Sequence, residues 1–179
     1  QHLLLSREMH SVQKIFVIHY TKLKDRKAHM LSELSSWFPD IDYEFIEEFD
    51  QEDLTDEIIN ENFDLQDFEK KFDRQMLRSE MSLCMKYKEA VNKISNMDKG
   101  EEFFILEDDV FFKESPLTYL DAMHDICDNN NINYDCVFLG EAWIRRGDDR
   151  DVFGKKEHPA TNGLCTVLYK KHSLQRLNS

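Results

Sequence analysis

The sequence predicts an α/β domain with a largely parallel sheet, and two observations lead to this prediction. Apolar, β-rich runs alternate with segments of helical periodicity along the chain. The first unit runs from a strand-like segment over 14–20, through a helical pattern over 26–38, to a second strand-like segment over 42–48. Strand, helix and strand in this order are typical of βαβ units, whose two strands lie parallel in one sheet.

The first three segments each carry their own signal. Segment 14–20, KIFVIHY, is almost continuously apolar, which is the pattern of a central strand covered on both faces. The helix that follows ends before Pro39, because proline cannot continue a helical hydrogen-bond ladder. Its expected buried face is spaced as in a helix: Met30 or Leu31, then Leu34 and Phe38.

The middle of the chain is acidic and then strongly helical. Segment 50–74 is expected to hold one short helix after Thr55 and a mobile surface loop. Segment 75–95 has apolar residues at steps of three and four, which predicts a helix. The side chains expected to face the core are Leu77, Met81, Cys84, Tyr87, Val91 and Ile94.

The last third of the chain repeats the alternation. A strand is expected over 102–106, and Ser115-Pro116 reads as an N-cap with proline at the first helical position. This helix should run through Cys127 and bury Leu117, Leu120, Met123 and Cys127. Further strands are expected over 133–140 and 164–170, on either side of a polar loop, with Ser173 capping a final helix.

Length and composition narrow the class of protein. The 179 residues fit a single domain over 1–179, with 1–13 read as a frayed end or tag and a possible truncation at the C-terminus. A formal net charge of −13 argues against nucleic-acid and anionic-membrane binding. No apolar run has the length of a transmembrane helix. The four cysteines lie in apolar patterns and are expected to be buried thiols, which predicts a reducing, cytoplasmic location.

The segment ILEDDV places three carboxylates, Glu107, Asp108 and Asp109, directly after the strand over 102–106. In open α/β sheets, ligands bind beyond the carboxyl ends of the strands. Adjacent buried carboxylates repel one another unless a cation neutralises them, and Mg²⁺ or Mn²⁺ commonly bridges carboxylates to substrate phosphates. In an extended segment Glu107 and Asp109 point to the same side. The residues leave two interpretations open, a metal–diphosphate clamp or a charged turn that ends the strand.

Several segments occur in an order known from one family. FVIHYTKLKDRKAHM carries an Asp-Arg pair at Asp25-Arg26, FIEEFD ends at Asp50, and FFILEDDV reads as an Asp-x-Asp-type motif with Glu107 in first place. In SEMSLCMKYKEAVNKI the corresponding positions are Glu80, Lys86 and Tyr87, and YDCVFLG and LCTVLYKKHSLQRL close the pattern. Over 15–177 the chain resembles glycosyltransferase family 25, the lipopolysaccharide-type and collagen-type sugar transferases. It departs from that family at Tyr87, where histidine is usual.

The resemblance implies a GT-A-type, Rossmann-like domain that binds a nucleotide-diphosphate sugar. It implies Mn²⁺ or Mg²⁺ as cofactor, a UDP-sugar as donor, and a glycan or other hydroxyl group as acceptor. The transferred group would be a hexose, possibly galactose in line with the family, moved with inversion of the anomeric centre. Such a transfer needs a cation for the leaving diphosphate and a base for the acceptor hydroxyl.

The implied roles fall on residues at the expected strand ends. Glu107 and Asp109 would bind the metal, and Asp108 would lie next to the donor ribose or sugar. The other residues expected to contact the donor are Val17, Ile18, His19, Tyr20, Arg26, Asp50 and Lys86. Each has a plain structural alternative: a packed histidine for His19, a surface ion pair for Arg26, a solvated lysine for Lys86 and a structural hydrogen bond for Asp108.

Glu141 is the predicted catalytic base. It follows Gly140 at the end of the strand over 133–140, so it should emerge at the same sheet edge as Asp109. The plain alternative is that it only opens a charged loop. For the whole protein, two other functions stay open: a catalytically inactive nucleotide-sugar-binding or structural domain, and a metal-dependent phosphohydrolase, which would usually need more ligands than the sequence offers.

Overall fold

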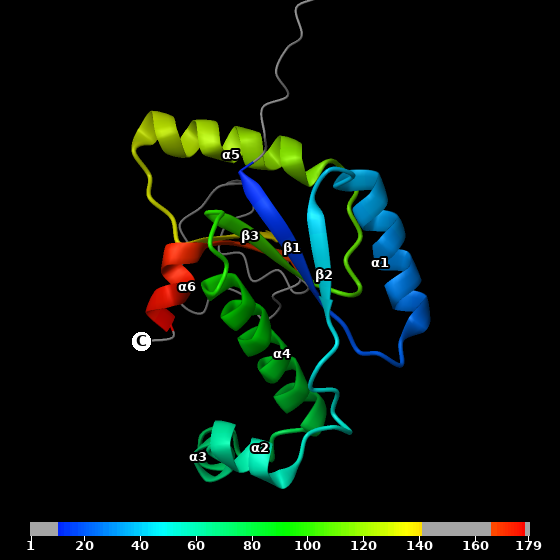
Figure 1. Cartoon of the computed structure of the whole chain (residues 1–179). Helices are drawn as coiled ribbons and strands as arrows, with labels where there is room; N and C mark the ends of the chain where they lie inside the picture. Colours follow the sequence, from blue (N-terminus) through cyan, green and yellow to red (C-terminus); the bar gives the residue numbers. More distant parts are fainter. Residues whose placement is uncertain (1–10, 141–165, 178–179) are drawn as a thin grey trace, which may run out of the picture.

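The computed structural model describes residues 11–140 and 166–177. The described part forms a five-stranded sheet in the order β2-β1-β3-β5-β4, flanked by helices (Figure 1). In chain order the elements are β1 (Val12–Ile18), α1 (Lys24–Trp37), β2 (Asp42–Ile46), α2 (Asp56–Asn62), α3 (Leu65–Phe72), α4 (Arg78–Ser95), β3 (Glu102–Glu107), α5 (Pro116–Asn130), β4 (Cys136–Gly140), β5 (Thr166–Lys170) and α6 (Lys171–Leu177).

Four of the five strands run in the same direction. β1 is parallel to both β2 and β3, whereas β5 is antiparallel to β3 and to β4. The prediction of an α/β domain with a mostly parallel sheet is therefore confirmed at this level. β5, the last of the described strands in the sequence, lies between β3 and β4, which the order of segments did not predict.

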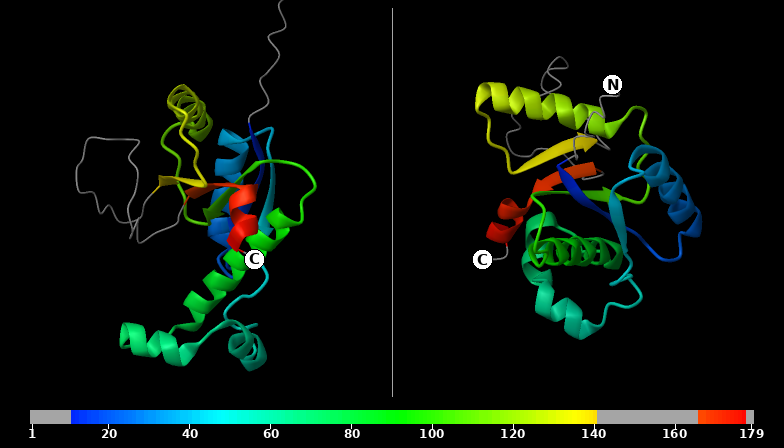
Figure 2. Two further views of the ribbon diagram at one scale, coloured as in Figure 1. Left: turned by 90° about the vertical axis from the view of Figure 1, so that its left-hand side faces the viewer. Right: turned by 45° about the horizontal axis from the view of Figure 1, so that its top comes forward.

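Helices cover both faces of the sheet and give three layers (Figures 1 and 2). Alternate residues of β1 enter opposite layers: Ile15 and Val17 pack with α1 and α5, while Phe16 and Ile18 pack with α4 and α6. A strand buried on both faces needs this continuous apolar run, as its sequence predicted. A third, smaller cluster joins the amino-terminal half of α4 to α2 and the loop before it.

The chain reverses its direction of winding at β1. It moves from β1 outward to β2 through α1 on one face, and returns past β1 to β3 through α4 on the other face. The carboxyl ends of β1 and β3 therefore flank a topological switch point, the place where open α/β sheets leave a crevice for ligands.

Several predicted elements differ in detail. β1 ends at Ile18 and β2 at Ile46, two residues earlier than predicted, because the paired ladders of the three parallel strands end there. Segment 50–74 holds two helices, α2 and α3, in place of one helix and a loop. Ser173 lies inside α6 and donates to Asp135 Oδ1 at 2.7 Å, so it does not cap that helix.

The buried face of α4 is rotated relative to the prediction. Leu77 and Cys84 are exposed, and the helix instead buries Met81, Ser82, Met85, Lys86, Ala90 and Ile94. Two polar residues belong to this face because they bond to the loop after β2, which an apolar stripe alone could not reveal. Cys84, Cys127 and Cys136 are free thiols, with Cys84 exposed, and Cys165 lies outside the described residues.

Among the residues that the structure describes, no helix is long and apolar enough to span a lipid bilayer.

Candidate active site

The carboxyl ends of β1, β2 and β3 bring three short polar segments together. His19, Tyr20 and Thr21 follow β1, Asp50 lies in the loop after β2, and Asp108 and Asp109 follow β3. The register pairs Ile18 with both Ile46 and Glu107, so the three strands end at the same level. The residues predicted for donor and metal binding lie at this edge or on the helices beside it, except Val17, which lies inside β1.

Asp108 is the buried member of the carboxylate triplet and joins β3 to β1. Its Oδ2 lies 2.8 Å from His19 Nδ1 and accepts from the Tyr20 backbone N–H at 3.4 Å. Its Oδ1 accepts from Arg26 Nη1 on α1 at 2.9 Å. Both plain alternatives therefore hold in this structure: Asp108 makes structural hydrogen bonds, and His19 is packed and hydrogen-bonded. His19 Nε2 has no hydrogen-bond partner among the described residues.

Asp109 and Arg26 form the exposed side of the same cluster. Arg26 Nη1 donates to Asp109 Oδ2 at 3.0 Å as well as to Asp108, and both Arg26 and Asp109 are about half exposed. The hydrogen bond to Asp108 raises the pKa of the Arg26 guanidinium above its usual value. Arg26 thus neutralises part of the triplet's charge while its own side chain still reaches solvent.

Glu107 is the least compensated of the three carboxylates. Burial, followed by the charge of Asp109, raises the pKa of Glu107 above its usual value. The Tyr87 hydroxyl, on α4, donates to Glu107 Oε1 at 3.3 Å and offsets part of this effect. Tyr87, at the position where the family resemblance implies histidine, therefore contacts the first of the three carboxylates.

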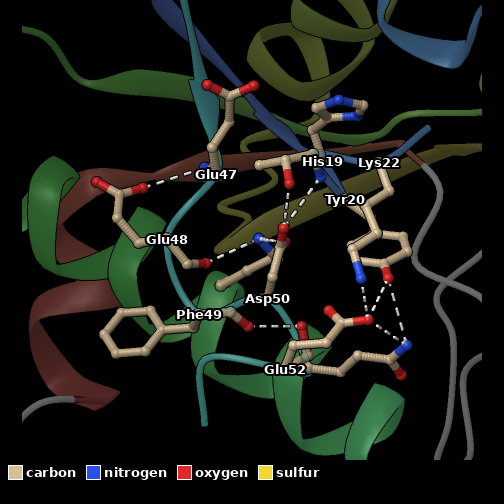
Figure 3. A network of polar contacts seen from close by, with 12 residues as sticks. His19, Tyr20, Lys22, Glu47, Glu48, Phe49, Asp50 and Glu52 are labelled. Carbon is tan, nitrogen blue, oxygen red and sulfur yellow. Dashed lines mark hydrogen bonds and ion pairs between the residues drawn. The ribbon is translucent and has the colours of Figure 1, made fainter. Parts of the chain in front are cut away.

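The loop after β2 is fixed by buried polar contacts (Figure 3). Lys86 Nζ lies 2.8 Å from Asp50 Oδ1 and donates to the Glu48 carbonyl at 2.8 Å, and its side chain is almost fully buried. The Lys86 ammonium forms an ion pair with Asp50 Oδ1, and no second group among the described residues donates a hydrogen bond to this oxygen. Lys86 is therefore no solvated lysine, contrary to the plain alternative.

Hydrogen bonds also fix the second carboxylate oxygen of Asp50 and the backbone of the residue before it. The hydroxyl and the backbone N–H of Thr21 both donate to Asp50 Oδ2. Burial opposes ionisation of Asp50, but the contacts with Lys86 and Thr21 outweigh it and leave its pKa lowered. Phe49, just before Asp50, has a left-handed φ of 64°, and its carbonyl accepts from Ser82 at 2.7 Å. Such strained, over-determined backbone is often found at functional sites.

An open pocket of about 290 Å³ lies between these groups. Its wall includes five of the predicted site residues beyond the triplet, namely Ile18, His19, Tyr20, Arg26 and Lys86, together with Glu107 and Asp108. Val17 is fully buried in the core and does not reach it. The described lining residues that sequence reasoning missed are Leu23, Gln51, Ser79, Ser82 and Leu83. Ser82 and Lys86 lie four residues apart on one face of α4, and this polar pair was the available signal.

The carboxylates suit a cation that takes only some of its ligands from the protein. Within residues 11–140 and 166–177, no group of three or more His, Cys, Asp or Glu side chains is placed to hold a metal ion. Glu107 and Asp109 are near enough for their charges to interact. Mg²⁺ and similar ions often use one or two carboxylates and complete their shell with water and substrate phosphates. These two residues fit that donor set.

Comparison with known protein families gives a match that covers most of the chain. A family model described as glycosyltransferase family 25 (LPS biosynthesis protein) matches residues 12–151. The chain belongs to glycosyltransferase family 25. The matched range contains β1, β2 and β3 and every described site residue. A comparison with curated proteins finds no match.

Membership of glycosyltransferase family 25 implies a glycosyltransferase, and with it a sugar donor and an acceptor. The strand-end pocket is lined by Glu107 and Asp108 of the ILEDDV segment. Glu141, the predicted base, lies within the matched range but outside the described residues, so its role stays a prediction.

Proposed function

We propose that this family 25 glycosyltransferase transfers a hexose from a UDP-sugar, with inversion, to a hydroxyl group of a glycan acceptor. The observation that carries the proposal is the pocket at the switch point between β1 and β3, lined by Glu107, Asp108, Arg26 and Lys86. A Rossmann-like sheet of the GT-A type uses this crevice for its nucleotide. A buried lysine and a half-exposed arginine provide positive charge where a diphosphate would lie.

In this proposal the described residues bind and orient the donor. The segment from Ile18 to Tyr20 lies against the nucleoside, and Asp108 holds Arg26 and His19 in fixed positions. Lys86 and Asp50 keep the loop after β2 in one conformation. Glu107 and Asp109 would hold Mn²⁺ or Mg²⁺, which, when bound, supplies charge stabilisation for the leaving diphosphate. Glu141 is the proposed base that accepts the acceptor hydroxyl's proton.

A second candidate is a nucleotide-sugar-binding domain without turnover. It is favoured by one contact, because Asp109, a proposed metal ligand, is already paired with Arg26 at 3.0 Å. A cation at Asp109 would have to displace or share that guanidinium. A phosphohydrolase gains no support, since no three-ligand metal cluster is found in the described part of the chain.

Thermal melting tests the donor half of the proposal. Ligands that bind the folded state raise the melting temperature, and the rise grows with the logarithm of ligand concentration over the dissociation constant. UDP and a UDP-hexose should raise the melting temperature in the presence of Mn²⁺, and much less with EDTA. No shift with any nucleotide sugar would contradict the proposal. Metal-dependent hydrolysis of the bound donor would then separate an active transferase from the inactive domain.

A further inference from the structure

Phe111 is the most exposed large apolar side chain in the described residues, at 73%. It follows the carboxylate triplet by two positions, in a segment whose burial alternates: Asp108 buried, Asp109 exposed, Val110 buried, Phe111 exposed. Single exposed apolar residues are common and need no explanation by themselves. The surroundings of Phe111, however, separate it from an ordinary surface residue.

The segment that carries Phe111 is held firmly on both sides of it. His29 Nε2 lies 2.8 Å from the Val110 carbonyl, and the Phe112 backbone N–H donates to Glu33 Oε2 at 2.9 Å. Phe112 also packs edge-on against Phe38 in the core, with ring centroids 5.4 Å apart. The ring of Phe111 itself rests on the His29 imidazole at a centroid distance of 4.0 Å. The contacts of the neighbouring residues therefore hold the backbone in a conformation that exposes Phe111.

Phe111 and His29 continue directly into the polar cluster. His29 follows Arg26 by three residues on α1, so the two side chains lie on the same face of the helix. Arg26 in turn donates to Asp109. A continuous surface thus runs from the aromatic ring to a guanidinium and a carboxylate. Neither Phe111 nor His29 lines the donor pocket, whereas Arg26 does, so this surface adjoins the pocket from outside.

We infer that Phe111, supported by His29, is the platform on which the acceptor's sugar ring stacks. This inference rests on the proposed function and adds the acceptor class: a pyranose with an apolar C–H face, and not an open-chain polyol. A pyranose presents apolar C–H groups on one face and hydroxyls around its edge. An exposed aromatic ring suits the first, and a neighbouring carboxylate and guanidinium suit the second as hydrogen-bond acceptor and donor.

The test measures direct sugar binding by saturation-transfer NMR, without any donor present. The probes are methyl β-D-galactopyranoside, methyl β-D-glucopyranoside and lactose, compared with galactitol and sorbitol, which carry hydroxyls but no ring. The variants are Phe111→Ala, Phe111→Trp and, as matched control, Phe72→Ala. Phe72 is 60% exposed on α3, which lies below the sheet and apart from the loop that follows β3 (Figure 1).

Wild type should bind at least one of the pyranosides and neither polyol. Phe111→Ala should weaken that binding by about tenfold, the effect of losing one aromatic stacking contact. Phe111→Trp should retain it, and Phe72→Ala should match wild type. Equal binding by wild type and a folded Phe111→Ala variant would overturn the inference, as would no preference for pyranosides over polyols.

The same variants separate this inference from the proposed function. Melting with UDP and Mn²⁺ should be unchanged by Phe111→Ala, because Phe111 does not line the donor pocket. If wild type binds pyranosides through Phe111 but never binds UDP, the sugar platform stands and the proposed donor is wrong. If UDP binds, and pyranosides bind equally well without Phe111, the inference about Phe111 is wrong and the proposed donor site is supported.

Discussion

Glu102 and Glu107 are the first and last residues of β3, and the two carboxylates have opposite environments. Glu102 accepts from the Ser11 and Tyr134 hydroxyls, and His124 Nε2 lies 3.1 Å from its Oε2. Burial opposes ionisation of Glu102, but these partners outweigh it and lower its pKa. At Glu107 burial and the charge of Asp109 prevail, and the pKa is raised. The same strand thus begins with a carboxylate that has several polar partners and ends with one that has few.

The difference between the two ends separates structural polar groups from functional ones. A buried carboxylate whose hydrogen bonds are complete contributes to stability and has nothing left to offer a ligand. A carboxylate with a raised pKa at the edge of a pocket lowers the stability of the folded protein when it is ionised. A bound cation would relieve this cost. The comparison predicts that substitutions at complete clusters will change stability, and that substitutions at the incomplete cluster will change binding.

The largest effect is expected at the ligand-binding end, where Asp50 and Lys86 form a buried ion pair. Lys86→Met should lower the free energy of unfolding by about 3–5 kcal/mol, because it leaves the Asp50 charge buried without its partner. Urea denaturation measures this loss. Lys88→Met, at an exposed lysine of the same helix, is the control and should stay within about 0.5 kcal/mol of wild type.

The double variant Asp50→Asn/Lys86→Met makes this prediction sharper. Removing both charges should restore part of the stability, since the penalty comes from the unpaired carboxylate and the two sites are coupled. Additive losses in the double variant would mean that the pair does not act as a unit.

Glu102→Gln should lower the free energy of unfolding by about 1–3 kcal/mol at pH 7, the usual range for breaking a buried hydrogen-bond network. The folded pKa of Glu102 is lowered, so its ionised form stabilises the protein above the unfolded pKa of about 4.3. This stabilisation is lost as the pH falls through the folded pKa. The difference in the free energy of unfolding between wild type and variant should therefore narrow below about pH 4. Denaturation experiments between about pH 7 and pH 3 measure this difference.

Glu101→Gln is the matched control for Glu102, because Glu101 is the exposed neighbour in the chain. Its effect on the free energy of unfolding should be small and nearly independent of pH. An equally large loss in this variant would remove the distinction between a satisfied buried carboxylate and a solvated one.

At the incomplete cluster, Asp109→Asn should weaken Mn²⁺-dependent UDP binding at least tenfold, or about 1.4 kcal/mol, by removing one charged ligand. Its melting temperature without ligand should stay close to that of wild type, because Asp109 is half exposed and its pair with Arg26 adds little. Calorimetric titration of UDP with and without Mn²⁺ measures the affinity. Unchanged metal-dependent affinity in the folded variant would exclude Asp109 as a ligand.

The smallest effect, and the one of opposite sign, is expected at Glu107. Glu107→Gln should raise the free energy of unfolding at neutral pH by about 0.5–1 kcal/mol, the scale of typical stabilising substitutions. The folded pKa of Glu107 is raised, so its ionisation costs stability above that pKa, and the cost disappears as the pH falls through it. Denaturation at pH 7 measures the gain. A loss of stability at pH 7 would mean that ionised Glu107 stabilises the fold as Glu102 does, which would contradict the contrast between the two ends of β3.

The strands around the site could be predicted from the sequence, but their order in the sheet was not predicted. Apolar runs marked β1, β2 and β3, and the carboxyl ends of parallel strands meet at one edge. The family resemblance then pointed to His19, Asp50 and Asp108 as residues of one site. The strand ends were placed two residues late for β1 and β2, because their ends depend on the paired neighbours and not on local composition.

The side of α4 that faces the site could not be predicted in the same way. Periodicity pointed to Leu77 and Cys84, yet the buried face includes Ser82 and Lys86. Ser82 and Lys86 can be buried because they donate hydrogen bonds to the Phe49 and Glu48 carbonyls. Those carbonyls belong to the loop after β2, which is distant in the sequence. Polar groups that are satisfied by tertiary contacts leave no trace in a hydrophobic pattern.

The position of β5 has a consequence for how the sheet is assembled. β5 follows β4 in the sequence, yet it lies between β3 and β4 and pairs with both. During translation β4 therefore emerges before the strand that it pairs with, and the edge of β3 stays open until residues 166–170 leave the ribosome. Open strand edges invite pairing with other chains. Release of a chain that stops before β5 should therefore favour aggregation over a smaller folded sheet.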